Sequence, residues 1–423
     1  MRAANPRAAV FKPAVVVSGL SITALSFHVM TSPSSISAPV KPPYVRLSTF
    51  YFVYFLALGV FVPYWSLYLQ HVAQFSPAQI GELMAVFMAS KVVAPFAWGW
   101  LADHYGQRLR LIRLASGLAL LCFAGMYWQQ TYAWVLVVMA GFGFFWNASL
   151  PQFEALTLAH LGAEVRRYSA IRLWGSIGFI VMVLWLPTWL NEQFAPLLNV
   201  LLLCFAAIWL STWLVRDKPQ TFAAPARGEL RQVLKHSGIG MLLLACALQQ
   251  ASHGVYYTFF SIYLEDHGYS LGFVRWMWAL GVIAEVVLFV FMHRLIQRFG
   301  ASRLFILALF LTGVRWILLG KYVDVLPMLL LAQVLHAATY GLFHAAAIHL
   351  VHHVFSGRLQ GRGQALYSGV SYGLGGAVGS LLSGYSWQWF GAEQTFFIAT
   401  VVVNVGLFVS LKALLELGRK YAD

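Results

Sequence analysis

The sequence predicts an all-α integral membrane protein with twelve transmembrane helices in two pseudo-symmetric six-helix bundles. Hydrophobic residues make up 60% of the 423 residues and charged residues only 10%, too few charges to cover a soluble surface. Apolar runs of about 18–25 residues, each long enough to cross a bilayer as a helix, recur along the chain. The second half of the chain also weakly repeats the first.

Twelve apolar runs follow one another along the sequence. Gly and Pro occur inside several of them, which membrane helices tolerate because neighbouring helices satisfy the freed backbone groups. The predicted spans are 47–69, 80–101, 111–128, 132–157, 168–190, 196–215, 238–264, 273–295, 303–320, 326–350, 365–385 and 391–415.

The positions of Lys and Arg in the loops indicate the orientation. The loops after the second, fourth, sixth, eighth and tenth spans contain sixteen Lys and Arg residues, whereas the loops on the other side contain only Lys321. Because Lys and Arg are enriched in cytoplasmic loops, we predict a multi-pass protein of the cell inner membrane with both termini cytoplasmic. The net charge of +14 therefore reflects topology, and nucleic-acid binding is not predicted.

The chain divides into four regions. Residues 1–44 contain basic residues and no acid, so they are either a targeting presequence or the result of a start codon assigned too early. We favour the second interpretation, with Met30 as the true start, and expect an extension that is disordered or not translated. The other regions are a first bundle over 45–215, a cytoplasmic linker over 216–236 and a second bundle over 237–423.

An internal repeat relates the two bundles. Shifting the first half by about 194 residues aligns residues 65–81 with 260–275 and places Gly106 on Gly300. Two six-helix halves joined by a polar loop are the plan of a secondary transporter that binds its solute between the halves. The chain contains no Walker motif, so ATP-driven transport is not supported.

Charged residues occur inside the apolar spans at matched depths. Glu154 and Arg172 are equally far from the centre of one loop, and Glu285 and Arg315 are equally far from the centre of another. At ~1.5 Å of rise per residue, each pair lies level in the membrane. Lys91 lies at the equivalent depth of the first half. Because such charges are costly in a bilayer, they normally face a cavity and pair.

These charges leave two interpretations open. Each acid–base pair is either part of a transport site or a static ion pair that holds two helices together. Lys91 is either a solute ligand or a residue that reaches toward the membrane surface or pairs with the gate.

The segment "GWLADHYGQR" (99–108) resembles the loop motif of the major facilitator superfamily, with Gly99, Asp103, Gly106 and Arg108 matching. The resemblance implies that this motif holds the cytoplasmic gate. Longer segments, including "IRLWGSIGF" (171–179) and "QVLHAATYGLFHAA" (333–346), resemble the 3-phenylpropionate transporter branch of the superfamily. That branch is related to lactose permease and its proton symporters.

The resemblance implies roles for the buried charges. Glu154 and Arg172 match the pair that grips the solute in lactose permease, and Glu285, Arg315 and His336 match its network for protons and solute. Lactose permease has an acid where Thr339 stands, which leaves the proton carrier open. We expect Glu285 to carry the proton, with His336, which titrates near neutrality, as the second candidate.

Aromatic and histidine side chains complete the expected site. Tyr257 and Trp65 belong to aromatic clusters that suit an aromatic solute, and His344 follows His336 by two turns. The spacing of the histidines in 344–353 is that of membrane di-iron desaturases, but the further histidine boxes of those enzymes are missing. We therefore predict no enzyme, no metal and no cofactor, and the three scattered cysteines favour no disulfide.

Together these observations predict a monomeric secondary transporter that imports a small organic solute by alternating access with a proton as the coupling ion. The predicted solute is an aromatic carboxylate of the 3-phenylpropionate type, held by Arg172, whose fork binds a carboxylate bidentately, and by Lys91. The alternatives are a sugar or nucleoside symporter, a multidrug efflux protein, and a membrane sensor without transport. Its partners are the solute, the proton and the lipid bilayer.

Overall fold

The computed structural model describes residues 42–190, 193–218 and 233–421, and in these ranges the chain contains helices and no β-strand. Inside a bilayer each backbone polar group needs a partner within the protein, and a long apolar run meets this need as a helix. The predicted all-α fold is therefore confirmed.

The first bundle contains six long helices. Ser76 begins the second of them with a capping box, in which its side chain accepts from the Gln79 N–H and the Gln79 side chain accepts from the Ser76 N–H. The helices are α1 (Tyr44–His71), α2 (Pro77–Tyr105), α3 (Arg108–Ala124), α4 (Tyr132–Leu161), α5 (Tyr168–Leu190) and α6 (Leu197–Ser211). Short 3-10 turns are η1 (Gly125–Tyr127), η2 (Gly162–Arg167) and η3 (Thr212–Leu214).

The second bundle is more irregular. Two π-helical segments, η4 (Ala337–Leu342) and η6 (Gly369–Gly375), interrupt it, and η5 (Gly357–Leu359) is a short 3-10 turn. Its α-helices are α8 (Ser237–Ser252), α9 (Gly254–Asp266), α10 (Leu271–Phe299), α11 (Ala301–Tyr322), α12 (Leu326–Val334), α13 (Phe343–Val354), α14 (Gln360–Ser368), α15 (Gly376–Phe390) and α16 (Ala392–Tyr421).

Ten helical segments of the described residues are long and apolar enough to cross a membrane. Two further spans complete the twelve: α8 followed by α9, and α14 followed by η6 and α15. The seventh predicted span, 238–264, is therefore not one continuous helix, because the chain breaks at His253. Just after the break, a Cβ at Gly254 would lie 2.2 Å from the Gly379 carbonyl carbon, so this backbone contact requires glycine.

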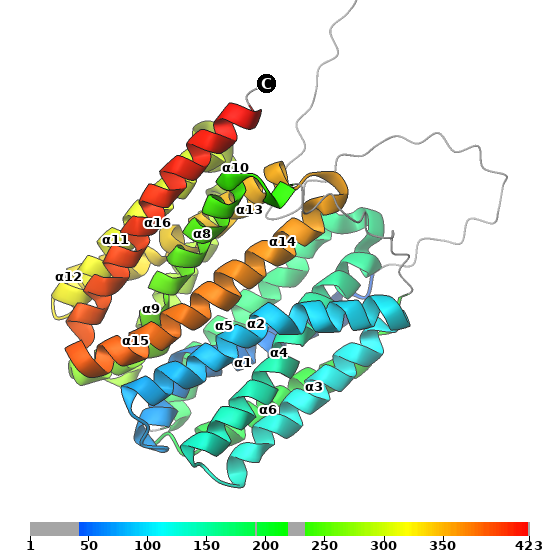
Figure 1. Ribbon diagram of the computed structural model, residues 1–423. Coiled ribbons are helices and arrows are strands. Elements are labelled where there is room, and N and C mark those ends of the chain that lie inside the picture. The colour runs from blue at the N-terminus through cyan, green and yellow to red at the C-terminus, as the bar shows by residue number, and fades with distance from the viewer. Residues whose placement is uncertain (1–41, 191–192, 219–232, 422–423) are drawn as a thin grey trace, which may run out of the picture.

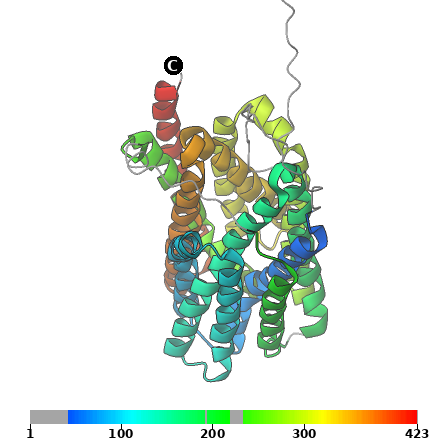
Figure 2. The same cartoon turned by 90° about the vertical axis from the view of Figure 1, so that its right-hand side faces the viewer.

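The two bundles lie on opposite sides of the molecule. Figure 1 shows α3, α4 and α6 on one side and α11, α12 and α16 on the other, with α2 and α15 between them. The view turned by 90° shows the long helices running side by side (Figure 2). The bundles pack against each other mainly through α1 with α9, α5 with α10, and α2 with α15 and η6.

The structure reproduces the internal repeat. Helix α10 begins and ends 194 positions after α2, the same separation as between His71 and Glu265. Gly106 and Gly300, which end these two helices, both have a positive φ. His71 Nε2 and Glu265 Oε2 lie 2.6 Å apart, within hydrogen-bond distance. A pseudo-two-fold axis relates equivalent residues of the two repeats. Because His71 and Glu265 are equivalent and touch each other, they lie at this axis.

Four polar contacts join the bundles at one end. We call the side with the loops after α2, α4, α6, α10 and α13 the basic side, and these contacts lie on the opposite side. They are His71 with Glu265, the Ala78 N–H with the Gln388 side chain, the Tyr385 hydroxyl with Glu82, and Arg275 with the Leu184 carbonyl.

Two predicted regions fall mainly outside the described residues. These are the N-terminal extension at 1–44, of which the structure describes residues from 42 onward, and the linker at 216–236, of which it describes 216–218 and 233–236.

Candidate functional site

Glu154 on α4 and Arg172 on α5 face each other. Arg172 Nε lies 3.9 Å from Glu154 Oε1, and the Tyr168 hydroxyl donates to the same oxygen at 3.2 Å. The Arg172 guanidinium also lies over the Phe55 ring, 3.9 Å from its centroid. Because 32% of the arginine side chain and 36% of the glutamate side chain are exposed, this pair, here called the Arg172 pair, can meet a solute.

Glu285 on α10 contacts His336 rather than Arg315. His336 Nε2 lies 3.8 Å from Glu285 Oε2, whereas no carboxylate of the described residues forms an ion pair with Arg315. Equal depth on two helices does not fix the face from which each side chain leaves. Glu285 instead packs on η4, where a Cβ at Gly341 would lie 2.9 Å from its Cγ.

Arg315 on α11 is completely buried in the second bundle. Its Nε donates to the Ala332 carbonyl at 2.8 Å, and its Nη1 donates to Thr339 Oγ1 at 3.2 Å. The guanidinium lies over the Tyr256 ring, 4.1 Å from its centroid. The neutral hydroxyl of Thr339 therefore lies next to the Arg315 guanidinium.

Further polar groups surround Arg315. The Tyr256 hydroxyl donates to Gln333 Oε1 at 3.0 Å. The Gln249 amide donates to the Thr339 carbonyl at 2.9 Å. We call the set of Arg315, Tyr256, Gln333, His336 and Thr339 the Arg315 cluster. The sequence identified Arg315 and His336 as site residues and Tyr256 as a member of an aromatic cluster, but gave Gln333 no role at the site. A polar side chain inside an apolar run is the signal that could have found Gln333.

The Arg172 pair lies close to the boundary with the second bundle. Helix α5, which carries Arg172, packs against α10, which carries Glu285. The structure therefore brings together helices that carry predicted residues of both halves.

His344 on α13 joins a group of tyrosines. Its Nδ1 lies 2.9 Å from the Tyr372 hydroxyl and 3.2 Å from the Tyr367 hydroxyl. Tyr340 lies between this group and His336, with its ring 6.1 Å from Tyr372 and 5.5 Å from His336 between centroids. These rings form an aromatic wall on the second bundle.

Lys91 on α2 lies at the boundary between the bundles. A Cβ at Gly373 of η6 would lie 3.3 Å from the Lys91 carbonyl carbon, and the Lys91 ammonium lies 5.5 Å from the centroid of the Phe87 ring. No described carboxylate forms an ion pair with it. Lys91 and Glu285 are also 194 positions apart, so the repeat places opposite charges at equivalent positions.

The two predicted aromatic ligands have different surroundings. The Tyr257 ring lies 6.1 Å from Tyr340 and 6.5 Å from His336, next to the Glu285–His336 contact. Trp65 is fully buried and stacks on Tyr68 at 5.1 Å inside the first bundle. The structure therefore brings Tyr257, but not Trp65, to the group of buried charges.

The segment 99–108 contains the last turns of α2 and the connection to α3. Arg108 Nη2 donates to Asp103 Oδ1 at 3.1 Å, and Gly106 ends α2 with φ +63°. Gly99 lies close to α4, where an added Cβ would lie 3.5 Å from Gln152 Nε2. All four matched residues thus lie on the basic side of the first bundle.

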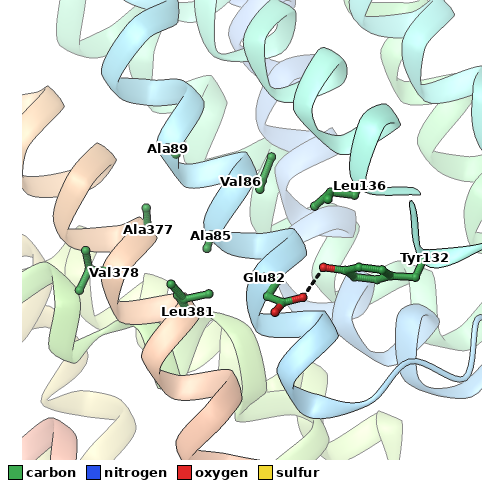
Figure 3. Close-up of a pocket in the computed structure, with 9 residues that line it drawn as sticks. All are labelled: Glu82, Ala85, Val86, Ala89, Tyr132, Leu136, Ala377, Val378 and Leu381. Atoms are coloured by element: carbon green, nitrogen blue, oxygen red, sulfur yellow. Dashed lines mark hydrogen bonds between the residues drawn. The ribbon is translucent and has the colours of Figure 1, made fainter. Parts of the chain in front are cut away.

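Glu82 on α2 forms polar contacts that were not predicted from the sequence. It accepts hydrogen bonds from Tyr132 of its own bundle and from Tyr385 of the other. It lies in a cavity of about 410 Å³ between α2, α4 and α15 that is otherwise lined mainly by apolar side chains (Figure 3). A lone carboxylate in the apolar run 80–101 was the available signal, the same one that identified Glu285.

Histidines and cysteines form no metal centre among the described residues, where no group of three or more His, Cys, Asp or Glu could hold an ion. Cys122, Cys204 and Cys246 are free thiols on separate helices.

Comparisons with known proteins identify similar chains. A family model described as "MFS_1 like family" matches residues 44–398. The chain is 30% identical to the "Probable 3-phenylpropionic acid transporter" of Escherichia coli (strain K12), over 86% of this chain and 96% of that protein. It is 30% identical to the "Maltose permease" of Geobacillus stearothermophilus, over 84% and 91%.

A solved structure has a similar fold. The crystal structure of the nucleoside transporter NupG matches with a TM-score of 0.78 at 15% identity, over 88% of this chain and 98% of that chain. At this identity the likeness concerns the fold alone.

Proposed function

Because this chain belongs to the MFS_1-like family of membrane transporters, we propose that it is a secondary transporter whose solute is a small aromatic carboxylate imported with a proton. The family and the matched relatives are transporters and not enzymes. The proposal for the solute comes from the charges at the site and from the name of one relative, a probable 3-phenylpropionic acid transporter.

The observation that carries this proposal is an excess of positive charge. The five charged candidates of the site are three cations and two carboxylates: Lys91, Arg172 and Arg315 against Glu154 and Glu285. Two further charges inside the spans, Glu82 and Arg275, offset each other and form hydrogen bonds near the end opposite the basic side. Charges in a membrane normally pair, and a carboxylate solute would balance the set. Arg172 is partly exposed, and a guanidinium can bind a carboxylate with two parallel hydrogen bonds.

The surroundings of Arg172 suit an aromatic ring. Phe55 lies under the guanidinium on the first bundle, and Tyr257, Tyr340 and Tyr372 form the wall of the second. Phenol rings combine apolar faces with hydroxyl groups. We propose that Arg172 and Lys91 hold the carboxylate while these rings contact the solute's own ring.

We propose that Glu285 carries the coupled proton, with His336 as its immediate partner. A carboxyl group that contacts a neutral imidazole can exchange a proton with it. Arg172 lies on α5, which packs against the α10 helix of Glu285, so a solute carboxylate bound at Arg172 would bring a negative charge toward Glu285. This links solute binding to proton uptake.

The proposed setting is the cell inner membrane, with the basic side cytoplasmic and the protein acting as a monomer by alternating access. The polar contacts on the opposite side would then close the outer end, and residues 99–108 would belong to the cytoplasmic gate. Single cysteines at Ser237 and Ser270 should react with an impermeant reagent from opposite sides of the membrane. Labelling from the same side contradicts this topology.

Uptake into proteoliposomes tests the function. The purified protein should accumulate labelled 3-phenylpropionate when the lumen is alkaline, and a protonophore should abolish the accumulation. Liposomes with the Arg172→Ala variant provide the control for a specific carboxylate site. Accumulation that is unaffected by the pH gradient contradicts proton symport, and absence of transport for every aromatic acid contradicts the proposed solute.

A sugar or nucleoside is the second candidate for the solute. The Glu154 and Arg172 side chains could both bind hydroxyl groups, and a relative of equal identity is a maltose permease. The same uptake measurement with labelled maltose and uridine distinguishes the two solute classes.

A further inference from the structure

Arg315 is a fully buried cation without a counter-charge among the described residues. We propose that the Arg315 cluster is a binding site for a small monovalent anion, separate from the Arg172 pair. The site lies within the second bundle, between α9, α11 and α12.

The charge of Arg315 is the first argument. A charge removed from water is costly unless an opposite charge accompanies it. The carboxylate that reaches this region, Glu285, contacts His336 and forms no ion pair with Arg315. The face of Tyr256 attracts the guanidinium, but a ring carries no net charge. Bound water could satisfy hydrogen bonds here without neutralising Arg315.

Unpartnered hydrogen-bonding groups are the second argument. Arg315 Nη2, Gln333 Nε2 and His336 Nδ1 have no hydrogen-bond partner in the protein, and each residue is at least 95% buried. Arg315 and Gln333 present N–H donors, and His336 does so in the tautomer with its proton on Nδ1.

These three groups share Tyr256 as a neighbour. Arg315 stacks on its ring, Gln333 accepts from its hydroxyl at 3.0 Å, and the His336 ring lies 5.6 Å from it between centroids. An anion among them would receive hydrogen bonds from several donors, and such charge-assisted bonds are the strong ones.

The anion has two possible sources with the same chemistry. One is a halide from solution, and this source needs no assumption about the solute. The other is the carboxylate of a second solute molecule, because the proposed function places the first on Arg172 and Lys91, and this source rests on the proposed function. Either would bind as a singly charged acceptor beside the free edge of Arg315.

Thr339 provides the test because its hydroxyl lies 3.2 Å from Arg315 Nη1. Thr339→Asp would place a carboxylate of similar size beside the guanidinium and would replace the anion from within the protein. Thr339→Asn has the same shape without the charge and serves as the matched control. Thermal unfolding of the purified proteins is measured in sodium gluconate with increasing chloride at constant ionic strength.

We expect chloride to stabilise the wild-type protein with a saturating dependence. When the chloride concentration is ten times the Kd for chloride, the equilibrium constant for unfolding should fall about elevenfold. Thr339→Asn and Arg172→Gln should retain this response. Thr339→Asp should lose it and should be more stable than Thr339→Asn without chloride. Identical behaviour of Thr339→Asp and Thr339→Asn would overturn the site.

Two further measurements are made. The first identifies the source of the anion, and the second uses only the wild-type protein, so it does not depend on the folding of a variant. If 3-phenylpropionate, rather than chloride, stabilises Arg172→Gln and fails to stabilise Thr339→Asp, the anion is the solute carboxylate. For the wild-type protein, crystals soaked in bromide should show anomalous density next to Arg315. Absence of that density, together with no effect of chloride or carboxylates on unfolding, would overturn the proposal even if the uptake experiment succeeds.

Discussion

Arg172 and Arg315 are the same residue type in opposite surroundings. Arg172 has a third of its side chain exposed and a loose contact of 3.9 Å with Glu154. Arg315 is fully buried and donates to two oxygens of its own bundle. An exposed charge with a loose partner can exchange that partner for a solute, whereas a buried and hydrogen-bonded charge is fixed in place.

The backbones of the two bundles differ in the same sense. In the described part of the first bundle, the 3-10 segments lie at the ends of spans. In the second bundle, a break at His253 and the π-helical segments η4 and η6 interrupt spans internally. Such irregularities are frequent at functional sites, and η4 and η6 contain Thr339, Tyr340 and Tyr372. The comparison suggests a first bundle that binds and a second bundle that couples.

The largest expected effect comes from Glu285→Gln. This change mimics a permanently protonated carboxyl, so the variant should bind solute and exchange it across the membrane. It should fail to accumulate solute against a gradient because no proton is taken up or released in the cycle. Counterflow, uphill uptake and thermal unfolding are measured on one preparation.

Glu154→Gln is the matched control in the first bundle, and it should retain uphill uptake at saturating solute. Intact accumulation by Glu285→Gln would move the proton to His336 or to another ion. Loss of stability together with every transport mode would instead identify a structural contact with His336.

The same substitution at the two arginines tests the comparison directly. Arg172→Lys should weaken solute binding by roughly 30–150-fold, because a charge-assisted contact is worth about 2–3 kcal/mol and lysine lacks the planar fork. Its stability should remain close to that of the wild type. Isothermal titration and thermal unfolding report the two quantities.

Arg315→Lys should show the reverse pattern. The loss of the planar guanidinium leaves the buried acceptors at Ala332 and Thr339 incompletely satisfied, at a cost of about 1–3 kcal/mol in stability for each. Equal losses of binding and stability at both positions would remove the distinction between a binding bundle and a fixed one.

The smallest expected effect concerns the end of the molecule away from the basic loops. Tyr385→Phe removes a hydrogen bond between the bundles to Glu82, whereas Tyr132→Phe removes one within the first bundle. Loss of a hydrogen bond worth about 1 kcal/mol would raise the ratio of molecules open at this end to molecules closed there about fivefold. The labelling rate of a cysteine at Ala85, in the cavity beside Glu82 (Figure 3), should therefore rise only for Tyr385→Phe.

Much of the fold followed from composition and periodicity. Long apolar runs must become helices in a bilayer because the backbone has no other partner for its polar groups. The 194-residue repeat is visible in the sequence. In the structure, α10 begins and ends 194 positions after α2, and His71 contacts Glu265, which is also 194 positions further along. The breaks within the seventh, tenth and eleventh spans could not be predicted, because they depend on contacts such as Gly254 with Gly379, which join distant segments.

The sequence by itself determined which charges enter the membrane and how deep they lie, because depth depends only on the number of residues from a loop and the rise of a helix. Only the tertiary structure decided their partners, because the rotation of each helix and the packing of neighbours select the face that a side chain occupies. Glu154 therefore meets Arg172 as its depth suggested. Glu285, placed at the same depth as Arg315, contacts His336 instead, and Arg315 remains buried without a counter-charge among the described residues.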